Sequence, residues 1–485
     1  MKFLSRAATF TCLSLALVPP LLAQSPALPD VLVVYEAFDP ADDSRPSEIH
    51  ALRLGADPSQ AAMTPYVLAS LGQRPLGSMD IIPDGAGGAF LGWAALDPDS
   101  FNGDIRLQHL DGQGRPMWSA PLAITDSPED DSEVTLAEDG LGGCLVAWSC
   151  TNAEFTTTAH LLRVDASGAR VWEAGLEAGP TFSTYASRPV ADGKGGAFQL
   201  ATSISAETLS TCMVQHVGAH GEALWEGGAR QLFTSGESES LERAFLDGTG
   251  ALLAVGSTMS FTDGSLSSCA VLAQRVEAQG KRLWGEPGCL RILDPLGCAG
   301  QPMAVPDGKG GLLLAYVASD PSQPASSDNL PDTDVLAQRV DASGKLLWVE
   351  TPMLILGGLR HECQLQLFAT ADAGCVLVAA SLDRHAVEPA QLLGERLSST
   401  GAAKWAKAGE ERPPLLVGQA TTGQLRGLWR GTGVDLFFLE EGEGGSHLLW
   451  TRVDAMGEPR SAGPLTLLAG PLSQRGMKVV ALSGR

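Results

Sequence analysis

The sequence lacks the short motifs that identify most reaction centres. Its 8 histidines and 9 cysteines show no HxH, HExxH or CxxC spacing, which argues against a compact zinc or redox site. It also contains no Gly-x-Ser-x-Gly elbow and no glycine-rich phosphate loop, the usual signatures of serine hydrolases and nucleotide-binding enzymes. A functional site must therefore be assembled from distant parts of the chain.

Basic residues are scarce. Lysine and arginine together number 33 against 56 aspartates and glutamates, which gives a formal net charge of −23 at pH 7. Nucleic acids and anionic membrane surfaces attract proteins that present a basic face. We therefore expect neither to be the main partner, and we attribute the acidic excess to solubility outside the cell.

Long apolar runs are absent except near the N-terminus. There, Lys2 and Arg6 precede an apolar stretch that ends at Ala23, the pattern of a secretory signal peptide over residues 1–23. An uncleaved membrane anchor is the alternative, but the stretch is short for the roughly 20 residues of a bilayer span and contains Pro19 and Pro20. We predict a secreted or periplasmic monomer with one domain over residues 24–485.

The cysteines permit disulfides without specifying them. Cys289 and Cys298 flank a short loop and form the best local pair, since an exported protein meets an oxidising compartment. Cys144 and Cys150 are expected on one extended strand, too far apart to bond. For the other cysteines, we expect buried free thiols.

A two-part phrase recurs along almost the whole chain. The first part is a turn such as Asp307-Gly-Lys-Gly-Gly311, and the second is a phrase such as Val340-Asp-Ala-Ser-Gly-Lys-Leu-Leu-Trp348. The second part places a glycine four residues before a tryptophan in six copies: Gly114-Trp118, Gly168-Trp172, Gly221-Trp225, Gly280-Trp284, Gly344-Trp348 and Gly401-Trp405. Repetition above fifty residues indicates a radial or stacked array.

Each repeat predicts four short strands. Both phrases are hairpin turns, because glycine allows positive φ and aspartate can accept bonds from the backbone that follows it. Four-stranded units of this length are typical of an all-β fold, the β-propeller, whose blades bury both faces of their inner strands. We predict eight blades, with seven as the alternative because the first and last copies are degenerate.

The two ends of the chain complement each other. The segment at Val31 aligns with the second strand of a repeat, and the segment from Met477 to Leu482 resembles a first strand. We expect the C-terminal strand to complete the first blade and close the ring. Closure would remove the open sheet edges that promote aggregation.

The Val340-to-Trp348 phrase resembles the tryptophan docking repeat of quinoprotein-type propellers, and the paired phrases are similar to repeats of secreted bacterial propeller proteins. The resemblance covers nearly the whole mature chain and rests on turns. It departs from the quinoprotein pattern, which has one more residue between aspartate and glycine. The chain also lacks the adjacent cysteine pair that those enzymes use beside their cofactor. The resemblance thus implies a propeller without the cofactor site, and no bound cofactor is expected.

The loops between the second and third strands vary most in length, so one face of the propeller is the variable-loop face. Loops on a rigid scaffold commonly carry binding sites. On this face Asp97, Asp99 and Asp104 supply hard oxygen ligands of the kind that calcium prefers, although their spacing departs from the EF-hand pattern. The alternative is that they are solvated loop charges.

A second candidate site faces the central channel. Counting four residues back from each Asp-Gly turn selects one position on the innermost strands: Asp80, Thr135, Arg188, Arg243, Met303, Phe368 and Arg426. Its three arginines could clamp a carboxylate or sulfate in the channel. The alternative is that they pair with neighbouring acids or face a sheet interface.

Another set of arginines follows the period of the fold: Arg163, Arg275, Arg339, Arg396 and Arg452. A residue that is repeated in most copies is expected to be architectural, bridging to a turn aspartate or stacking on a tryptophan. His109 and His216 occupy the same position, so we interpret them as substitutes for the arginine and not as metal ligands.

We predict a secreted, non-enzymatic propeller that binds an extracellular protein or glycan on its variable-loop face. The alternative is a hydrolase or lyase acting on an anionic saccharide in the channel. In that alternative Arg188, Arg243 and Arg426 would hold the substrate, and an acid such as Asp80 or Glu133 would lie near the channel mouth.

Overall fold

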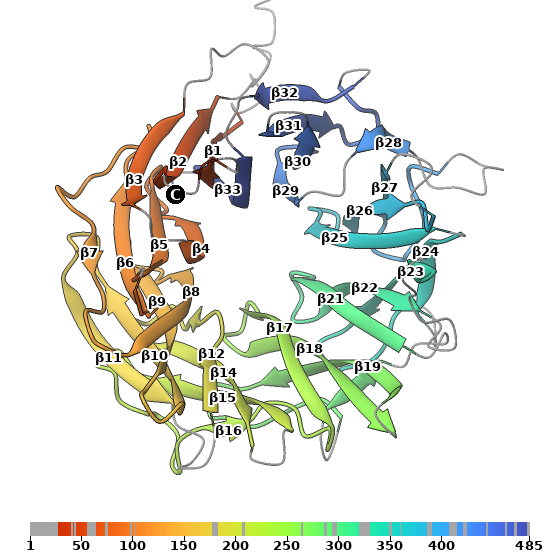
Figure 1. Ribbon diagram of the computed structural model, residues 1–485. Coiled ribbons are helices and arrows are strands. Elements are labelled where there is room, and N and C mark those ends of the chain that lie inside the picture. The colour runs from red at the N-terminus through yellow and green to blue at the C-terminus, as the bar shows by residue number, and fades with distance from the viewer. Residues whose placement is uncertain are drawn as a thin grey trace, which may run out of the picture.

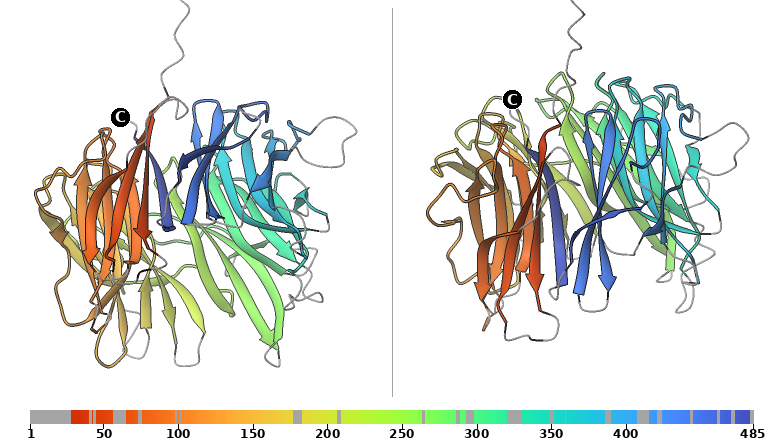
Figure 2. Two further views of the ribbon diagram at one scale, coloured as in Figure 1. Left: turned by 45° about the horizontal axis from the view of Figure 1, so that its top comes forward. Right: turned by 90° about the horizontal axis from the view of Figure 1, so that it is seen from above.

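The computed structural model describes residues 28–482 apart from 40–41, 43–44, 56–64, 73–75, 98, 101, 177–182, 206–208, 263–264, 286–288, 293–297, 320–329, 349–351, 359, 386–389, 407–414, 421–423, 443–444, 461–462 and 470–472. The described part is all-β. Mostly four-stranded antiparallel sheets stand radially around a common centre, as the blades of a propeller do (Figure 1). Their strands run from one face of the ring to the other (Figure 2), so the turns gather on the two faces.

The strands follow one another from the centre outward in each sheet, and we give them in that order. The first sheets contain β33 (Ser473–Leu482), β1 (Asp30–Phe38), β2 (Ser47–Leu54) and β3 (Tyr66–Gly72); then β4 (Leu76–Pro83), β5 (Ala89–Leu96), β6 (Gly103–Leu110) and β7 (Leu122–Ala123); then β8 (Asp130–Glu138), β9 (Cys144–Thr151), β10 (Thr157–Val164) and β11 (Arg170–Leu176).

The next two sheets contain β12 (Ser183–Ala186), β13 (Val190–Ala191), β14 (Ala197–Ile204), β15 (Ser210–Val217) and β16 (Arg230–Gln231); then β17 (Ser238–Leu246), β18 (Leu252–Thr262), β19 (Ser265–Val276) and β20 (Leu290–Ile292). In the first of them, β12 and β13 both pair with β14 and share the innermost position.

The remaining strands are β21 (Cys298–Pro306), β22 (Leu312–Ser319), β23 (Thr333–Val340) and β24 (Met353–Leu356); β25 (His361–Ala369), β26 (Cys375–Leu382), β27 (Ala390–Leu397) and β28 (Leu415–Ala420); and β29 (Leu425–Arg430), β30 (Gly433–Gly442), β31 (Gly445–Val453) and β32 (Leu465–Leu468). The sets β21–β24 and β25–β28 form one eight-stranded sheet, joined by a single parallel pairing of Thr333 with His361.

The two ends of the described chain lie in the same sheet. Strand β33 pairs antiparallel with β1, with Val31 opposite Ala481 and Val34 opposite Lys478. This pairing confirms the prediction that the C-terminal strand completes the N-terminal sheet. Strand β33 is therefore the innermost strand of this sheet and covers the edge of β1 that would otherwise be open.

The Asp-Gly phrases form the predicted hairpin turns. Asp84 illustrates them: its Oδ1 accepts hydrogen bonds from the backbone N–H groups of Ala86 (2.7 Å) and Gly88 (2.8 Å), and its own N–H donates to the carbonyl of Gly88. Gly87 has φ +99, which is a conformation that favours glycine. The aspartate thus fixes the turn locally, before any packing between sheets.

Several of the repeat tryptophans contact a turn of the following set of strands. Four indole N–H groups donate to the carbonyl oxygen two residues before the turn glycine of the following set of strands: Trp225 to Ala278 (2.7 Å), Trp284 to Ala342 (3.1 Å), Trp348 to Ser399 (3.1 Å) and Trp405 to Ala455 (2.9 Å). Gly344 shows why a glycine is needed beneath the ring. It has φ +89, and a Cβ there would lie 2.9 Å from Trp284. The recurring glycine and tryptophan therefore touch across neighbouring sheets.

The periodic arginines are architectural, as predicted. Arg339 Nη2 donates to the buried Asp307 Oδ2 (2.8 Å), and its Nη1 donates to the carbonyl of Ser399 in the next set of strands (2.9 Å). Arg163, Arg275, Arg396 and Arg452 contact acids of their own sheets in the same way. His109 and His216 replace them, with Nε2 atoms 3.0 and 3.2 Å from the turn aspartates Asp84 and Asp192. These histidines are therefore packing residues.

The predicted Cys289–Cys298 pair is wrong. Cys289 is a free thiol, and the residue that forms a disulfide is Cys269 on β19. The prediction considered only neighbours along the chain, whereas the sheet brings other strands beside β19. Cys144 and Cys150 lie on the single strand β9 and are both free, as predicted.

Among the described residues, no helix is long and apolar enough to cross a membrane. The predicted signal peptide, residues 1–23, lies outside the described residues and stays a prediction.

We expect substitutions in different Arg–Asp pairs to lower the free energy of unfolding by different amounts. Arg339→Met leaves the carboxylate of Asp307 buried without a cation and is expected to destabilise the fold by about 3–5 kcal/mol. Arg396→Met is the matched control, because its partner Asp372 has a side chain 48% exposed, and the expected loss is below about 1 kcal/mol. Thermal unfolding of both variants measures the difference. Equal losses would show that burial does not govern these pairs.

The junction of β23 and β25 predicts a dependence of stability on pH. Glu362 is buried, and desolvation raises its pKa to about 7; a hydrogen bond from Ser381 opposes the rise, while Asp334 and Asp332 add to it. The folded protein then holds a proton that the unfolded chain releases near its ordinary value of 4.5. The contribution of Glu362 to stability therefore falls, by up to about 3 kcal/mol, as the pH rises from about 4.5 to about 7.

Glu362→Gln removes this titration and leaves a group that can still accept the bond from Ser381. Its melting temperature relative to wild type should rise between pH 5 and pH 8. A constant difference between the two proteins across that range would contradict a raised pKa of Glu362.

Candidate functional site

One register position of the innermost strands faces the centre of the ring. In most sheets it pairs with the fourth residue after the turn: Asp80 with Gly92, Thr135 with Ala147, Arg243 with Val255, Met303 with Ala315, Gln366 with Val378 and Arg426 with Phe437. Arg188 lies between β12 and β13 and opposite β14, and Lys478 of β33 pairs with Val34. Each of eight inner strands or strand pairs thus contributes one residue.

These residues line a central cavity of about 580 Å³. The lining residues are Asp80, Ile81, Thr135, Ser187, Arg188, Leu241, Glu242, Arg243, Ala244, Gln366, Arg426, Lys478 and Val479. Met303, the remaining member of the register set, contacts the cavity through Arg243, whose Nη2 lies 3.1 Å from its sulfur. The cavity therefore combines four cationic side chains with two carboxylates in a chain that is strongly acidic as a whole.

Asp80 organises one side of the cavity. Its Oδ2 accepts hydrogen bonds from the N–H of Leu136 (2.9 Å) and from Arg188 Nη2 (2.5 Å), and Arg188 Nη1 donates to the carbonyl of Leu136. Lys478 Nζ lies 3.8 Å from Asp80 Oδ1. This buried carboxylate therefore serves as counter-ion to two of the four cations.

The other two cations have no such partner. Among the described residues, neither Arg243 nor Arg426 forms an ion pair; Arg243 donates to the carbonyl of Glu242 (2.7 Å) and Arg426 to that of Leu425 (2.9 Å). Restricted solvation in the channel lowers the pKa of both guanidinium groups, and the charges of Arg188 and Arg426 add to the effect on Arg243, which Glu242 partly opposes. A bound anion would relieve this repulsion.

Lys478 is the cation that is easiest to deprotonate. Desolvation lowers its pKa, and the charges of Arg426, Arg188 and Arg243 lower it further, while Asp80 raises it. A lysine in such surroundings can exchange a proton nearer neutral pH than an exposed one. The cavity thus combines arginine side chains with a lysine whose pKa is lowered.

Five of the residues selected from the sequence meet in this cavity: Asp80, Thr135, Arg188, Arg243 and Arg426. Phe368 does not share their position, because the count from Asp372 starts two residues too late. The N–H of Thr370 donates to the carbonyl of Gly374, the bond that Asp84 makes to Gly88. Thr370 therefore begins the turn, and Gln366 lies at the channel.

Lys478, Gln366 and Glu242 are among the lining residues that sequence reasoning missed. Lys478 follows from the recognised C-terminal strand, but that strand has no Asp-Gly turn after it from which to count back. Gln366 was hidden by the misplaced turn. Glu242 and its neighbour Arg243 both line the cavity. Side chains that alternate strictly between the two faces of β17 would not do so, but a register shift between Leu241 and Arg243 interrupts the alternation.

Glu133 is not part of the cavity lining, which corrects its selection as a channel-mouth acid. Strand β8 has a register shift between Ser132 and Thr135, and Glu133 has φ 57. Its exposed side chain accepts a hydrogen bond from Ser149 Oγ (3.0 Å) and so is held on the neighbouring strand β9.

The three aspartates proposed for calcium do not form a ligand set. Asp97 Oδ1 accepts bonds from the N–H groups of Asp99 and Ser100 (both 3.0 Å), and Asp104 Oδ2 accepts one from Arg106 (3.1 Å). Within the described ranges, no group of three His, Cys, Asp or Glu side chains is placed to hold a metal ion. Asp97 instead stabilises its own loop.

Comparisons with known proteins found likenesses among solved structures alone. No protein-family model matches the chain, and no curated protein matches it. Among solved structures, an ulvan lyase from a new family of polysaccharide lyases has a TM-score of 0.46 and 9% identity over 78% of this chain and 93% of its own. The periplasmic gluconolactonase of Pseudomonas aeruginosa has a TM-score of 0.43 and 13% identity over 93% and 99%.

A puromycin-hydrolyzing peptidase of Mycobacterium tuberculosis is also similar, with a TM-score of 0.36 and 15% identity over 71% of this chain; the match spans only 48% of that peptidase. These likenesses agree with the propeller-like all-β fold. No quinoprotein-type docking repeat is shown by them, so that part of the resemblance stays a prediction.

The prediction of a non-enzymatic binding protein is corrected in this respect: the similar structures include enzymes such as the ulvan lyase and the gluconolactonase, together with an initiation factor. At these TM-scores the likeness concerns the fold, and the reaction has to be inferred from the cavity.

The electrostatic coupling in the cavity predicts how the pKa of Lys478 responds to its neighbours. Asp80→Asn should lower that pKa further, because the carboxylate raises it, and Arg426→Gln should raise it, because a repelling charge is removed. NMR titration of isotopically labelled lysines measures both shifts, with Lys345 on an exposed turn as reference. A rise of the Lys478 pKa in Asp80→Asn would contradict the arrangement.

Proposed function

We propose that the protein is a hydrolase or lyase that acts on an anionic saccharide in the central cavity, and that the cavity favours a lyase. The observation that carries the proposal is the convergence of Arg188, Arg243, Arg426 and Lys478 on one cavity with a single buried counter-ion, Asp80. Guanidinium groups bind carboxylate and sulfate through paired hydrogen bonds.

A uronate-containing saccharide suits this arrangement. Arg243 and Arg426, which lack ion-pair partners among the described residues, would bind the carboxylate and stabilise the negative charge that develops when the adjacent carbon loses its proton. Arg188 is held by Asp80 and would orient the same group. The binding groups would therefore stabilise the transition state more than the ground state, as catalysis requires.

Lys478 is the proposed base. In its neutral form it would take the proton from the carbon that bears the carboxylate. The electron pair of that C–H bond would form a carbon–carbon double bond as the glycosidic C–O bond breaks. The ammonium group of Lys478 would then return the proton to the leaving oxygen. Desolvation and the three arginines lower the pKa of Lys478, which favours the neutral amine that this step needs.

Hydrolysis is supported less well. Most glycosidases need two carboxyl groups, one of which must donate a proton to the leaving oxygen. Asp80 is already the counter-ion of Arg188 and Lys478, which makes it a poor proton donor. Glu242 is the only other acid in the cavity lining, and its Oε1 accepts a bond from Ser240 Oγ (3.2 Å).

The test is incubation of the purified mature chain with uronate-containing oligosaccharides. A lyase produces both new reducing ends and the ultraviolet absorbance of an unsaturated uronate, whereas a hydrolase produces reducing ends alone. Lys478→Met should lower kcat by about 10²–10⁴-fold with little change in substrate affinity. Arg243→Gln should raise KM and lower kcat/KM by roughly 10–100-fold.

Lys345→Gln is the matched control, because it removes one positive charge from an exposed turn whose lysine does not line the cavity. It should leave turnover unchanged. Reducing ends without absorbance would identify a hydrolase, and absence of both with carboxylated and sulfated substrates would overturn the proposed activity. An unchanged kcat in Lys478→Met would remove Lys478 from the mechanism.

We also propose that the ring has eight blades and that the chain is exported after removal of residues 1–23. The strand sets, each with one innermost strand or strand pair, support the blade count. The charged start and short apolar middle of the N-terminal segment support export.

A further inference from the structure

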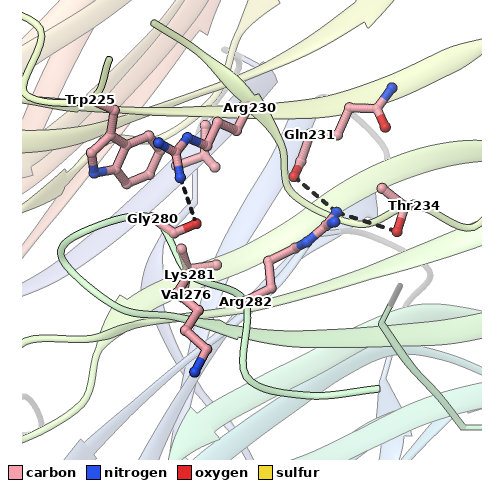
Figure 3. Close-up of a pocket in the computed structure, with 9 residues that line it drawn as sticks. Trp225, Arg230, Gln231, Thr234, Val276, Gly280, Lys281 and Arg282 are labelled. Carbon is pink, nitrogen blue, oxygen red and sulfur yellow. Dashed lines mark hydrogen bonds between the residues drawn. The ribbon is translucent and has the colours of Figure 1, made fainter. Parts of the chain in front are cut away.

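A second cationic cavity lies at the outer edge of the ring, between the β12–β16 sheet and the β17–β20 sheet. We call it the outer groove; it has a volume of about 410 Å³ (Figure 3). Its lining residues are Val214, Trp225, Arg230, Gln231, Thr234, Val276, Gly280, Lys281 and Arg282. None of them belongs to the central cavity, so the two sites are separate.

The two arginines of the outer groove are held in place by both sheets. The guanidinium carbon of Arg230 lies 5.1 Å from the centre of the Trp225 ring, and Nη1 donates to the carbonyl of Gly280 (3.2 Å). Arg282 Nη1 donates to Thr234 Oγ1 (3.3 Å) across the groove (Figure 3). Positions fixed in this way reduce the entropy lost on binding.

The charges of the outer groove are not neutralised. No acidic residue lines it, and Arg230, Lys281 and Arg282 form no ion pair with any residue that the structure describes. The arginine just upstream behaves differently: Arg275 contacts Asp247 at 2.6 Å. Three unpaired cations in one cavity are unexpected in a chain with 56 acidic and 33 basic residues.

We propose that the outer groove binds the carboxylate or sulfate group of an anionic saccharide chain. Arg230 and Arg282 each use Nη1 for their hydrogen bonds to Gly280 and Thr234, so their other N–H groups can donate to an oxyanion. The exposed Lys281 adds a third positive charge. Gln231 and Thr234 bring an amide and a hydroxyl to the same cavity, which suit the hydroxyl groups of a sugar. The volume suits a small ligand or part of a chain.

The observations favour a saccharide over a nucleic acid. Nucleic-acid binding typically engages about 6–10 phosphates with a comparable number of cations. The outer groove offers three, and the net charge of −23 repels a densely charged polymer. This binding does not depend on the proposed reaction in the central cavity.

The test compares binding of a heparin-derived oligosaccharide, which carries sulfate and carboxylate, with that of an oligogalacturonate, which carries carboxylate alone. Calorimetry is performed on Arg243→Gln/Arg426→Gln, in which the central cavity has lost two of its cations. At least one of the two saccharides should still bind, with one site per chain. Adding Lys281→Gln/Arg282→Gln should then weaken binding by about tenfold or more at low salt.

Lys345→Gln is again the matched control, because Lys345 follows the turn glycine Gly344 as Lys281 follows Gly280. It should leave the affinity unchanged. Lys281→Gln alone keeps the contact of Arg282 with Thr234 and should lose part of the affinity without a lower melting temperature.

Three results would overturn the inference. The first is the loss of all saccharide binding in Arg243→Gln/Arg426→Gln, because the central cavity would then be the single binding site. The second is equal weakening by Lys281→Gln and Lys345→Gln, which indicates general electrostatic attraction. The third is competition by a single-stranded DNA oligomer as effective as that of the saccharides. Loss of lyase activity leaves each of these results unaffected, so the two proposals fail independently.

Discussion

The hydrogen bond from a tryptophan indole to a turn carbonyl of the following sheet is the contact on which the rest of the structure depends. It needs a glycine below the ring, as Gly344 lies below Trp284, and a turn held by its aspartate, as Asp341 Oδ1 accepts from the N–H of Ser343 (2.8 Å). Repetition of this contact sets the angle between neighbouring sheets. The inner strands then meet around one centre.

The cavity follows from that arrangement. Because the same register position of each inner strand faces the centre, residues more than 300 positions apart in the sequence, such as Asp80 and Lys478, come within 3.8 Å of each other. Architecture and function use different positions: Arg339 sits on a third strand and pairs with Asp307, whereas Arg243 sits on an inner strand and has no ion-pair partner among the described residues. The repeat therefore separates the charges that pack the sheets from the charges that line the cavity.

Much of this was predictable from the sequence. The turns, the four-stranded units and the C-terminal strand follow from local chemistry, and so does the grouping of Arg188, Arg243 and Arg426. The errors have local causes as well. Gln366 was missed because Thr370 begins its turn without an aspartate, and Glu133 was misplaced by a register shift in β8. The outer groove could not be predicted, because Arg230 and Arg282 meet only through packing of two sheets.

The central claim is that the inner-strand position forms an anion-binding cavity. A crystal structure of the chain with a uronate-containing oligosaccharide tests it most directly. We expect the carboxylate within hydrogen-bond distance of Arg243 and Arg426, with Lys478 beside the carbon that loses its proton. A saccharide bound elsewhere, with both arginines turned onto acidic side chains of the protein, would contradict it.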